Sequence, residues 1–225
     1  MEKKIILSCP TLKKELLKAV EEAGFQGEIR FLPQSLHSSP MDLQKYLQNM
    51  IDQMDDMEEI FLCVSGCGGA AAGLRAVYAP LVVPRTRDCV DILLSGENLK
   101  ELKRPKDGFF LSHGWMEYMK NSRLDLNRIL AEKGPEATEE YMRNMFRVFE
   151  NFYIIDTGIY PLEEIEEYIQ PLVEMIDGRV SKIQGGWGIL KKMAAGKIDD
   201  DFLVARKGET VKEVLQRERH MKSFI

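Results

Sequence analysis

Short apolar segments of strand character alternate with longer segments whose apolar residues recur at helical spacing, and this alternation constrains the fold more than any other feature. The expected strands are 4–8, 28–32, 60–65, 80–84, 109–111, 152–155, 179–183 and 201–205, the last at an edge. Turn residues follow the strands, and the sequence signals of β-hairpins are absent between them. Strands that are joined through helices pair in parallel. The sequence therefore predicts an α/β protein with a Rossmann-like, mostly parallel sheet and helices on both faces.

The length and hydrophobic content favour one domain. At 225 residues and 44% hydrophobic content, the chain can bury a sizeable core. We expect a single α/β domain over residues 1–225. It carries a helical excursion over 122–151, broken near Gly134 and Pro135, and a charged C-terminal tail over 208–225 that forms a surface helix.

The charge pattern and hydropathy argue against two classes of partner. The 31 basic and 36 acidic residues give a net charge of −5 and are mixed along the chain, so no basic surface for nucleic acid is expected. No stretch approaches the roughly 18 apolar residues that a membrane span needs, and the amino terminus has no apolar leader. We expect a cytoplasmic protein without a nucleic-acid or membrane partner, whose four cysteines are free thiols.

The stretch from Ile60 to Gly73 is the most distinctive part of the sequence. An apolar strand breaks into the turn Gly66-Cys67-Gly68-Gly69, and three alanines follow. This pattern predicts a strand, a tight turn and a helix, and such turns at the carboxyl ends of strands bind ligands in α/β sheets. Glycines permit positive φ and close approach of a ligand. Gly66, Gly68 and Gly69 are therefore candidate cofactor-binding residues around Cys67.

Other polar residues also follow predicted strands. Right-handed crossovers bring all such turns to one edge of a parallel sheet. The residues expected along that edge are Cys9, His37, Cys67, Cys89, His113, Asp156 and Trp187.

The three turn cysteines, Cys9, Cys67 and Cys89, predict a metal site. Thiolates bind zinc and iron–sulfur clusters, and a nearby helix N-terminus lowers the pKa of a thiol. The alternative is that each cysteine is a small, semi-buried residue in a tight turn. His37 is the preferred fourth ligand, with His113 or an open position as alternatives. Cys63 lies inside a strand and is expected in the core.

Two further features are candidate contacts for a ligand. Arg85, with Arg87 and Asp88, precedes Cys89 and can bind an anion, stabilise a thiolate or form a solvated salt-bridged turn. Trp187, in the glycine-rich turn 185–188, can lie over a flat ligand or plug the core. The spacing of a dinucleotide-binding loop is absent, which argues against NAD.

At these residues the chain resembles a bacterial and archaeal family, domain-of-unknown-function family 1638, over roughly residues 4–205. The resemblance rests on these segments: Ser8-Cys9, Leu36-His37-x-x-Pro40, Gly66-Cys67-Gly68, Pro84-Arg85-x-x-Asp88-Cys89, Phe110-Leu111-Ser112, Tyr141 to Asn151 and Gly185 to Gly188. It strengthens the metal prediction. Members of this family often resemble proteins that occur alongside corrinoid-dependent methyltransferase systems. This resemblance implies a corrinoid protein or a methyltransferase as partner. The D-x-H-x-x-G signature of many corrinoid carriers is absent.

The leading hypothesis combines these observations. It is a cysteine-ligated metal protein of one-carbon or corrinoid-linked methyl transfer, with zinc or an iron–sulfur cluster that activates a thiol or another small molecule. Two alternatives stay open. One is a metal-free module that binds a small molecule or a partner protein, and the other is a thiol redox enzyme.

Overall fold

The computed structural model describes residues 3–64 and 67–222. The chain divides into two compact units. The first unit comprises residues 1–102 and 187–225, and the second comprises residues 103–186. Each unit has its own parallel strands and covering helices, and each is described here by itself.

The first unit is built on a five-stranded sheet. Its strands are β1 (Lys4–Ser8), β2 (Glu28–Phe31), β3 (Glu59–Cys63), β4 (Leu81–Pro84) and β8 (Phe202–Ala205), in the order β2-β1-β3-β4-β8. The first four are parallel, whereas β8 pairs antiparallel with β4. The chain therefore builds outward from β1 to β2 on one side and from β3 to β4 on the other. This strand order is that of a doubly wound sheet whose switch point lies between β1 and β3.

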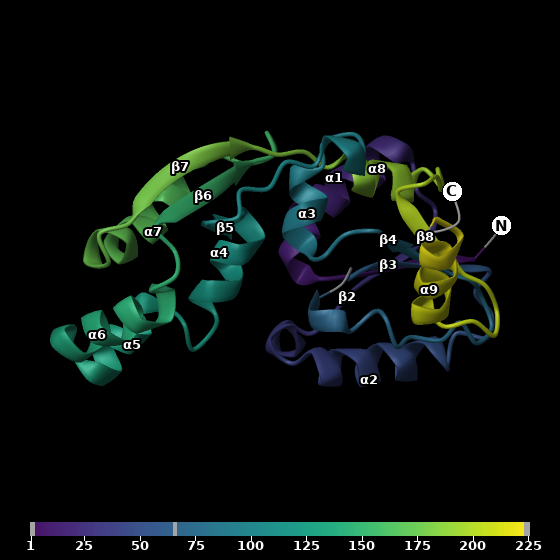
Figure 1. Cartoon of the computed structure of the whole chain (residues 1–225), viewed down its shortest axis with the longest axis horizontal. Helices are drawn as coiled ribbons and strands as arrows, with labels where there is room; N and C mark the ends of the chain where they lie inside the picture. Colours follow the sequence, from purple (N-terminus) through teal and green to yellow (C-terminus); the bar gives the residue numbers. More distant parts are fainter. Residues whose placement is uncertain (1–2, 65–66, 223–225) are drawn as a thin grey trace. The chain divides into compact units, whose positions relative to one another are not determined.

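Helices cover both faces of this sheet (Figure 1). They are α1 (Lys13–Ala23), α2 (Pro40–Ile51), α3 (Cys89–Leu94), α8 (Gly188–Ala194) and α9 (Val211–Lys222). Short 3₁₀ turns are η1 (Pro10–Leu12), η2 (Gln34–Ser38), η3 (Cys67–Gly69) and η4 (Leu99–Glu101). Because side chains alternate along a strand, Ile5 and Leu7 join one core cluster with α2 and α9, while Ile6 is buried on the opposite face.

The second unit has a three-stranded parallel sheet in the order β5-β6-β7. Its strands are β5 (Gly108–Leu111), β6 (Asn151–Asp156) and β7 (Arg179–Gln184). Its helices are α4 (His113–Lys120), α5 (Leu126–Lys133), α6 (Pro135–Phe146) and α7 (Glu163–Met175). Phe152 is fully buried in a core formed with these helices. Gly134, at φ 76°, ends α5, and Pro135 begins α6, where its missing N–H is no loss.

The α/β, Rossmann-like prediction is confirmed, and each predicted strand corresponds to an observed one. The prediction of one sheet edge for all the turn residues is wrong, because β5, β6 and β7 form a separate sheet. That one cooperative domain spans both units stays a prediction. In the described part of the chain, no helix has the length and apolar character that crossing a bilayer requires.

The helix predicted after Cys67 is also wrong. Residues 70–80 form turns and a single bridge instead. The backbone of this segment pairs with the chain at the start of α9: Ala76 N–H donates to the Glu209 carbonyl at 2.9 Å, and Val211 N–H donates to the Leu74 carbonyl at 3.0 Å. These hydrogen bonds to a distant part of the sequence, together with tight local turns such as Ala72 N–H to the Gly69 carbonyl at 3.1 Å, stand where an α-helix was expected.

Candidate functional site

Four of the predicted site residues lie beyond the carboxyl ends of four adjacent parallel strands. Cys9 follows β1, His37 lies in η2 after β2, Cys67 begins η3 after β3, and Cys89 begins α3 after β4. Ligands of doubly wound sheets bind in the crevice at the switch point. Cys9 and Cys67 flank that point, and the prediction that these four residues share one sheet edge is confirmed.

Cys9 and His37 are in direct contact. The Cys9 Sγ lies 3.7 Å from His37 Nδ1 and 3.1 Å from the Thr11 hydroxyl oxygen. Cys9 is 6% exposed and Thr11 is 2% exposed, whereas His37 is half-buried. The 3₁₀ turn that begins at Pro10 brings Thr11 back toward Cys9. The thiol therefore has an imidazole and a hydroxyl as polar neighbours in an otherwise apolar setting.

Cys67 occupies a strained turn. Its φ is 24°, which lies in the left-handed region that a non-glycine residue rarely adopts, and Gly68 follows at φ 67°. The thiol is half-buried at the end of β3. Backbone strain of this kind is concentrated at functional sites, where the surrounding structure maintains it.

Cys89 is the first residue of α3 and is buried. The preceding Asp88 caps this helix, since its carboxylate accepts a hydrogen bond from the Asp91 N–H at 3.1 Å. Asp91 is itself buried and accepts two hydrogen bonds from the Arg87 guanidinium, at 2.8 and 2.9 Å. Capping and the bidentate pair together fix the turn that presents Cys89.

The thiols influence one another, as groups that share one site do. Burial, with smaller contributions from the nearby Cys9 and Asp88, raises the pKa of Cys67 to about 12. Burial also raises the pKa of Cys89 well above its usual value, with Cys9 and Cys67 contributing and a hydrogen bond from Thr11 opposing. The pKa of Cys9 is raised by burial in the same way.

The expectation that helix N-termini lower the pKa of these thiols is therefore wrong, because burial outweighs the local dipoles. The pKa of the His37 imidazole is lowered by burial, with the Asp88 carboxylate opposing. Without a bound cation the site holds neutral thiols and a neutral imidazole at neutral pH. Metal binding would then displace the thiol protons.

The predicted cofactor-binding residues do not all lie in one place. Gly69 and Arg85 line a cavity of about 210 Å³ whose wall also contains Val83, Leu203 and Leu215. Gly68 lies in the adjoining turn. Gly66 lies outside the described residues. A wider hollow at the opposite, amino end of the strands, near Lys4 and Gln26, is remote from these turns.

Trp187 has a different setting. The Lys191 ammonium lies 5.0 Å from the centre of the indole ring. The neighbouring Gly188 packs so closely that a Cβ would lie 2.4 Å from the carbonyl oxygen of Gly96. The need for glycine at position 188 is thus explained by chain packing.

The remaining predicted residues His113 and Asp156 belong to the other unit. His113 and Asp156 follow strands of the second unit. Among residues 3–64 and 67–222, the group of histidine, cysteine and acidic side chains whose ligand atoms all lie within 4.8 Å of one another is His113, Glu117 and Glu164. No three of the four predicted ligands of the first unit are that close together.

Some site residues were not predicted from the sequence. Thr11 gives no signal beyond its place two residues after Cys9. Glu117 was missed because α4 was not predicted, and Glu164 was missed because it lies on α7, far in sequence from His113 and Glu117. The available signal was Ser112, whose side chain accepts a hydrogen bond from Trp115 N–H and caps the helix, with His113 and Glu117 at i and i+4 behind it.

The fold and these residues define an α/β protein with a doubly wound sheet, in which the turns at the carboxyl ends of four adjacent strands carry three cysteines and a histidine. Residues 31–194 match the family described as "Protein of unknown function (DUF1638)", and the chain belongs to that family. The match includes His37, Cys67 and Cys89, whereas Cys9 precedes it. Comparison with curated proteins and with solved structures gave no match.

Proposed function

We propose that Cys9, Cys67 and Cys89 bind one metal centre, with His37 as the fourth ligand. The observation that carries the proposal is the 3.7 Å distance between Cys9 Sγ and His37 Nδ1 at the switch point. Two ligands of one tetrahedral zinc ion, with Zn–S near 2.3 Å and Zn–N near 2.0–2.1 Å, lie about 3.6 Å apart. This pair is therefore already spaced for joint ligation.

The other two thiols would complete the site by small side-chain movements. Thiolates on one tetrahedral zinc lie about 3.8 Å apart. Cys9 contributes to the raised pKa of both Cys67 and Cys89, which supports the proximity of these two thiols to Cys9. Rotation about χ1 moves a sulfur atom by a few ångströms without movement of the backbone. The proposal therefore requires that both thiols rotate toward Cys9 when the metal binds.

Zinc is the ion that this donor set favours, because three cysteines and one histidine form a common tetrahedral zinc site. The neutral state of His37, which burial maintains, is the form that binds metal. An iron–sulfur cluster held by the three thiolates is the other outcome that the experiment below distinguishes.

The family resemblance suggests a role in one-carbon or corrinoid-linked methyl transfer. When bound, the metal would hold a small thiol as its thiolate if His37 leaves the fourth position open. The protein residues would then supply the binding crevice, exclude water and hold the ligand thiolates. A small-molecule ligand, a corrinoid protein and a methyltransferase are the partners proposed, within a reducing cytoplasm that keeps the thiols free.

The test is metal analysis of the full-length protein purified without oxygen. We expect one zinc ion per chain, or stoichiometric iron with visible colour for a cluster. Cys9→Ser, Cys67→Ser and Cys89→Ser should each lose the metal. Cys63→Ala is the matched control, since Cys63 is buried against Met193 at 3.1 Å in the core and should not contribute. A wild-type protein that takes up neither metal would overturn the proposal.

A second candidate function is binding of a small molecule without metal, and the 210 Å³ cavity beside Gly69 and Arg85 favours it. Its apolar wall and neighbouring guanidinium suit a small molecule with an acidic group. Under this alternative, Cys67→Ala leaves ligand binding intact, whereas Val83→Trp, which fills the cavity, abolishes it. The thiol redox alternative has less support, because reactive cysteines have lowered pKa values and burial raises these.

A further inference from the structure

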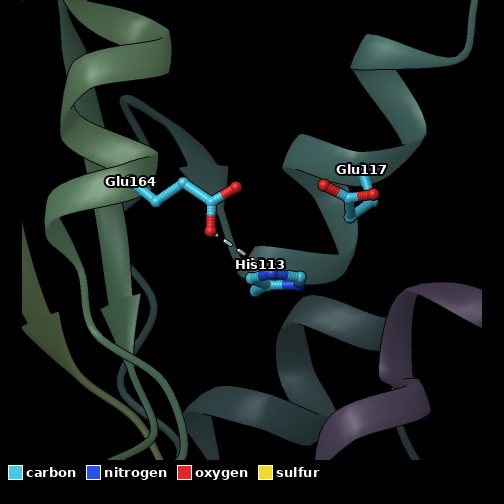
Figure 2. Close-up of side chains that lie close together, drawn as sticks. All are labelled: His113, Glu117 and Glu164. Atoms are coloured by element: carbon cyan, nitrogen blue, oxygen red, sulfur yellow. Dashed lines mark ion pairs between the residues drawn. The ribbon is translucent and has the colours of Figure 1, made fainter.

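The second unit contains a separate group of metal-binding side chains, His113, Glu117 and Glu164. His113 and Glu117 lie on successive turns of α4, and Glu164 extends toward them from the first turn of α7 (Figure 2). One ligand atom from each of the three lies within 4.8 Å of the other two. An imidazole and two carboxylates therefore converge from two helices.

The helical framework holds these side chains in place. The cap by Ser112 fixes the start of α4 at His113. Residues i and i+4 of a helix lie on one face, so Glu117 is placed above His113. The imidazole is 13% exposed and packs against Tyr160, with ring centres 5.3 Å apart. The histidine is thus largely fixed, while the two glutamates reach it from the surface.

The spacing is close to that of ligands on one ion. His113 Nε2 lies 3.8 Å from Glu164 Oε2. Two adjacent ligands at about 2.1 Å from a metal lie roughly 3.0 Å apart in octahedral geometry and roughly 3.4 Å apart in tetrahedral geometry. The imidazole and carboxylate would need to approach by less than about 1 Å. Glutamate side chains on a surface can move that far by rotation about their own bonds.

Lys120 is the cation that now balances this charge. Its ammonium lies 3.0 Å from Glu164 Oε1 and 3.6 Å from Glu117 Oε1. The opposite oxygen of Glu164, Oε2, faces His113. Glu164 can therefore hold Lys120 through one oxygen and a metal ion through the other. Lys120 would weaken metal binding by repulsion, which gives the site a distinctive test.

We propose that His113, Glu117 and Glu164 bind a divalent first-row metal ion of the Mn²⁺ or Fe²⁺ type. Two carboxylates and one imidazole favour these ions over softer ones, and three protein ligands leave coordination positions open for water. This site shares no residue with the thiol centre, because all three ligands belong to the second unit.

The test is a titration of the full-length protein with Mn²⁺. The concentration of unbound Mn²⁺ is measured at each step by electron paramagnetic resonance. Thiolates are poor ligands for Mn²⁺, so the thiol centre does not interfere. We expect one Mn²⁺ per chain. His113→Ala and Glu164→Gln should each weaken binding by about tenfold or more, since loss of even an outer partner of a metal ligand costs 10–100-fold. Lys120→Met should tighten binding several-fold.

Glu163→Gln is the matched control, because Glu163 is the neighbouring exposed residue of α7 and is not part of the group. It should bind Mn²⁺ as the wild type does. Glu164→Gln changes an exposed side chain, so it keeps the test valid if His113→Ala fails to fold. Absence of Mn²⁺ binding to both the wild type and Lys120→Met, or equal binding to Glu164→Gln and the wild type, would overturn the proposal.

Discussion

Gly68 and Pro40 pack so closely that a Cβ on Gly68 would lie 2.6 Å from the Pro40 Cγ. Pro40 is the first residue of α2, and Gly68 lies in the turn that carries Cys67. The contact joins the loop of His37 to the turn of Cys67. Two parts of the proposed metal site are thus positioned against each other by packing of the Pro40 ring on the Gly68 backbone, rather than by the side chains of the proposed ligands.

Gly68→Ala should therefore destabilise the fold more than Gly69→Ala. Both residues have positive φ, 67° and 90°, so each alanine costs about 1–2 kcal/mol in backbone strain. Only Gly68 adds the clash with Pro40, which costs a further 1–3 kcal/mol or so. Urea unfolding of the two variants measures the difference. Equal losses would mean that the Pro40 contact relaxes without cost.

Thr11→Val should weaken metal binding without removing a ligand. The Thr11 hydroxyl contacts Cys9 Sγ at 3.1 Å, and its hydrogen bond lowers the pKa of Cys89. Its loss raises the pKa of both thiols and should reduce metal affinity by about 10–100-fold. Competition with a zinc chelator measures this change.

Thr138→Val is the control for that variant. The Thr138 hydroxyl donates to the Gly134 carbonyl at 2.6 Å in the second unit and is also buried. Its loss should cost about 1 kcal/mol of stability and leave metal affinity unchanged. If both valine variants bind zinc as tightly as the wild type, Thr11 has no positioning role.

Arg87→Ala should destabilise the first unit by about 1–3 kcal/mol, because it removes two charge-assisted hydrogen bonds from a buried carboxylate. The Asp91 side chain is 2% exposed, so water does not replace those bonds readily. Arg30→Ala is the control: its pair with Glu28 is about half exposed and should contribute about 0–1 kcal/mol. Chemical unfolding compares them, and a smaller loss for Arg87→Ala than for Arg30→Ala would contradict the buried-pair argument.

The metal-free protein should lose stability at alkaline pH. Burial raises the pKa of Cys63 from 9.0 to about 12. Above about pH 9 the unfolded chain releases the thiol proton while the folded chain keeps it, so the unfolded state binds fewer protons and stability falls as pH rises. The loss continues until the pH passes about 12. In Cys63→Ala this contribution is absent, so its stability should fall less steeply.

Urea unfolding under reducing conditions between about pH 8 and pH 10.5 measures this pH dependence, because the window begins below the unfolded pKa of a thiol. Parallel curves for the wild type and Cys63→Ala would show that Cys63 titrates alike in both states.

Local sequence was sufficient for the strands and for much of the proposed metal site. The apolar run at Ile5–Leu7 predicts β1 because both of its faces are buried. The shared edge of Cys9, Cys67 and Cys89 follows from the geometry of parallel strands and needs no contact information.

Non-local pairing explains the failures. Ala70 to Ala72 have high helix propensity, yet they form turns, and Lys212 N–H donates to the Ala72 carbonyl at 2.8 Å. Likewise, nothing near β4 in the sequence indicates that its outer edge pairs with β8 and not with β5. Two sheets therefore replaced the single sheet expected. Helix and strand propensities depend on residues that are close in sequence, whereas the hydrogen-bonding partners of these segments are far away in sequence.

The second unit interrupts the first: the chain leaves the first unit after residue 102 and re-enters it at residue 187. β8, which completes the sheet against β4, is therefore made after the other strands of the described residues. On the ribosome, the outer edge of β4 has no pairing strand while the whole inserted unit is synthesised, and an open strand edge can pair with other chains. Newly made protein thus has an extended period of vulnerability to aggregation, which ends when residues 202–205 emerge.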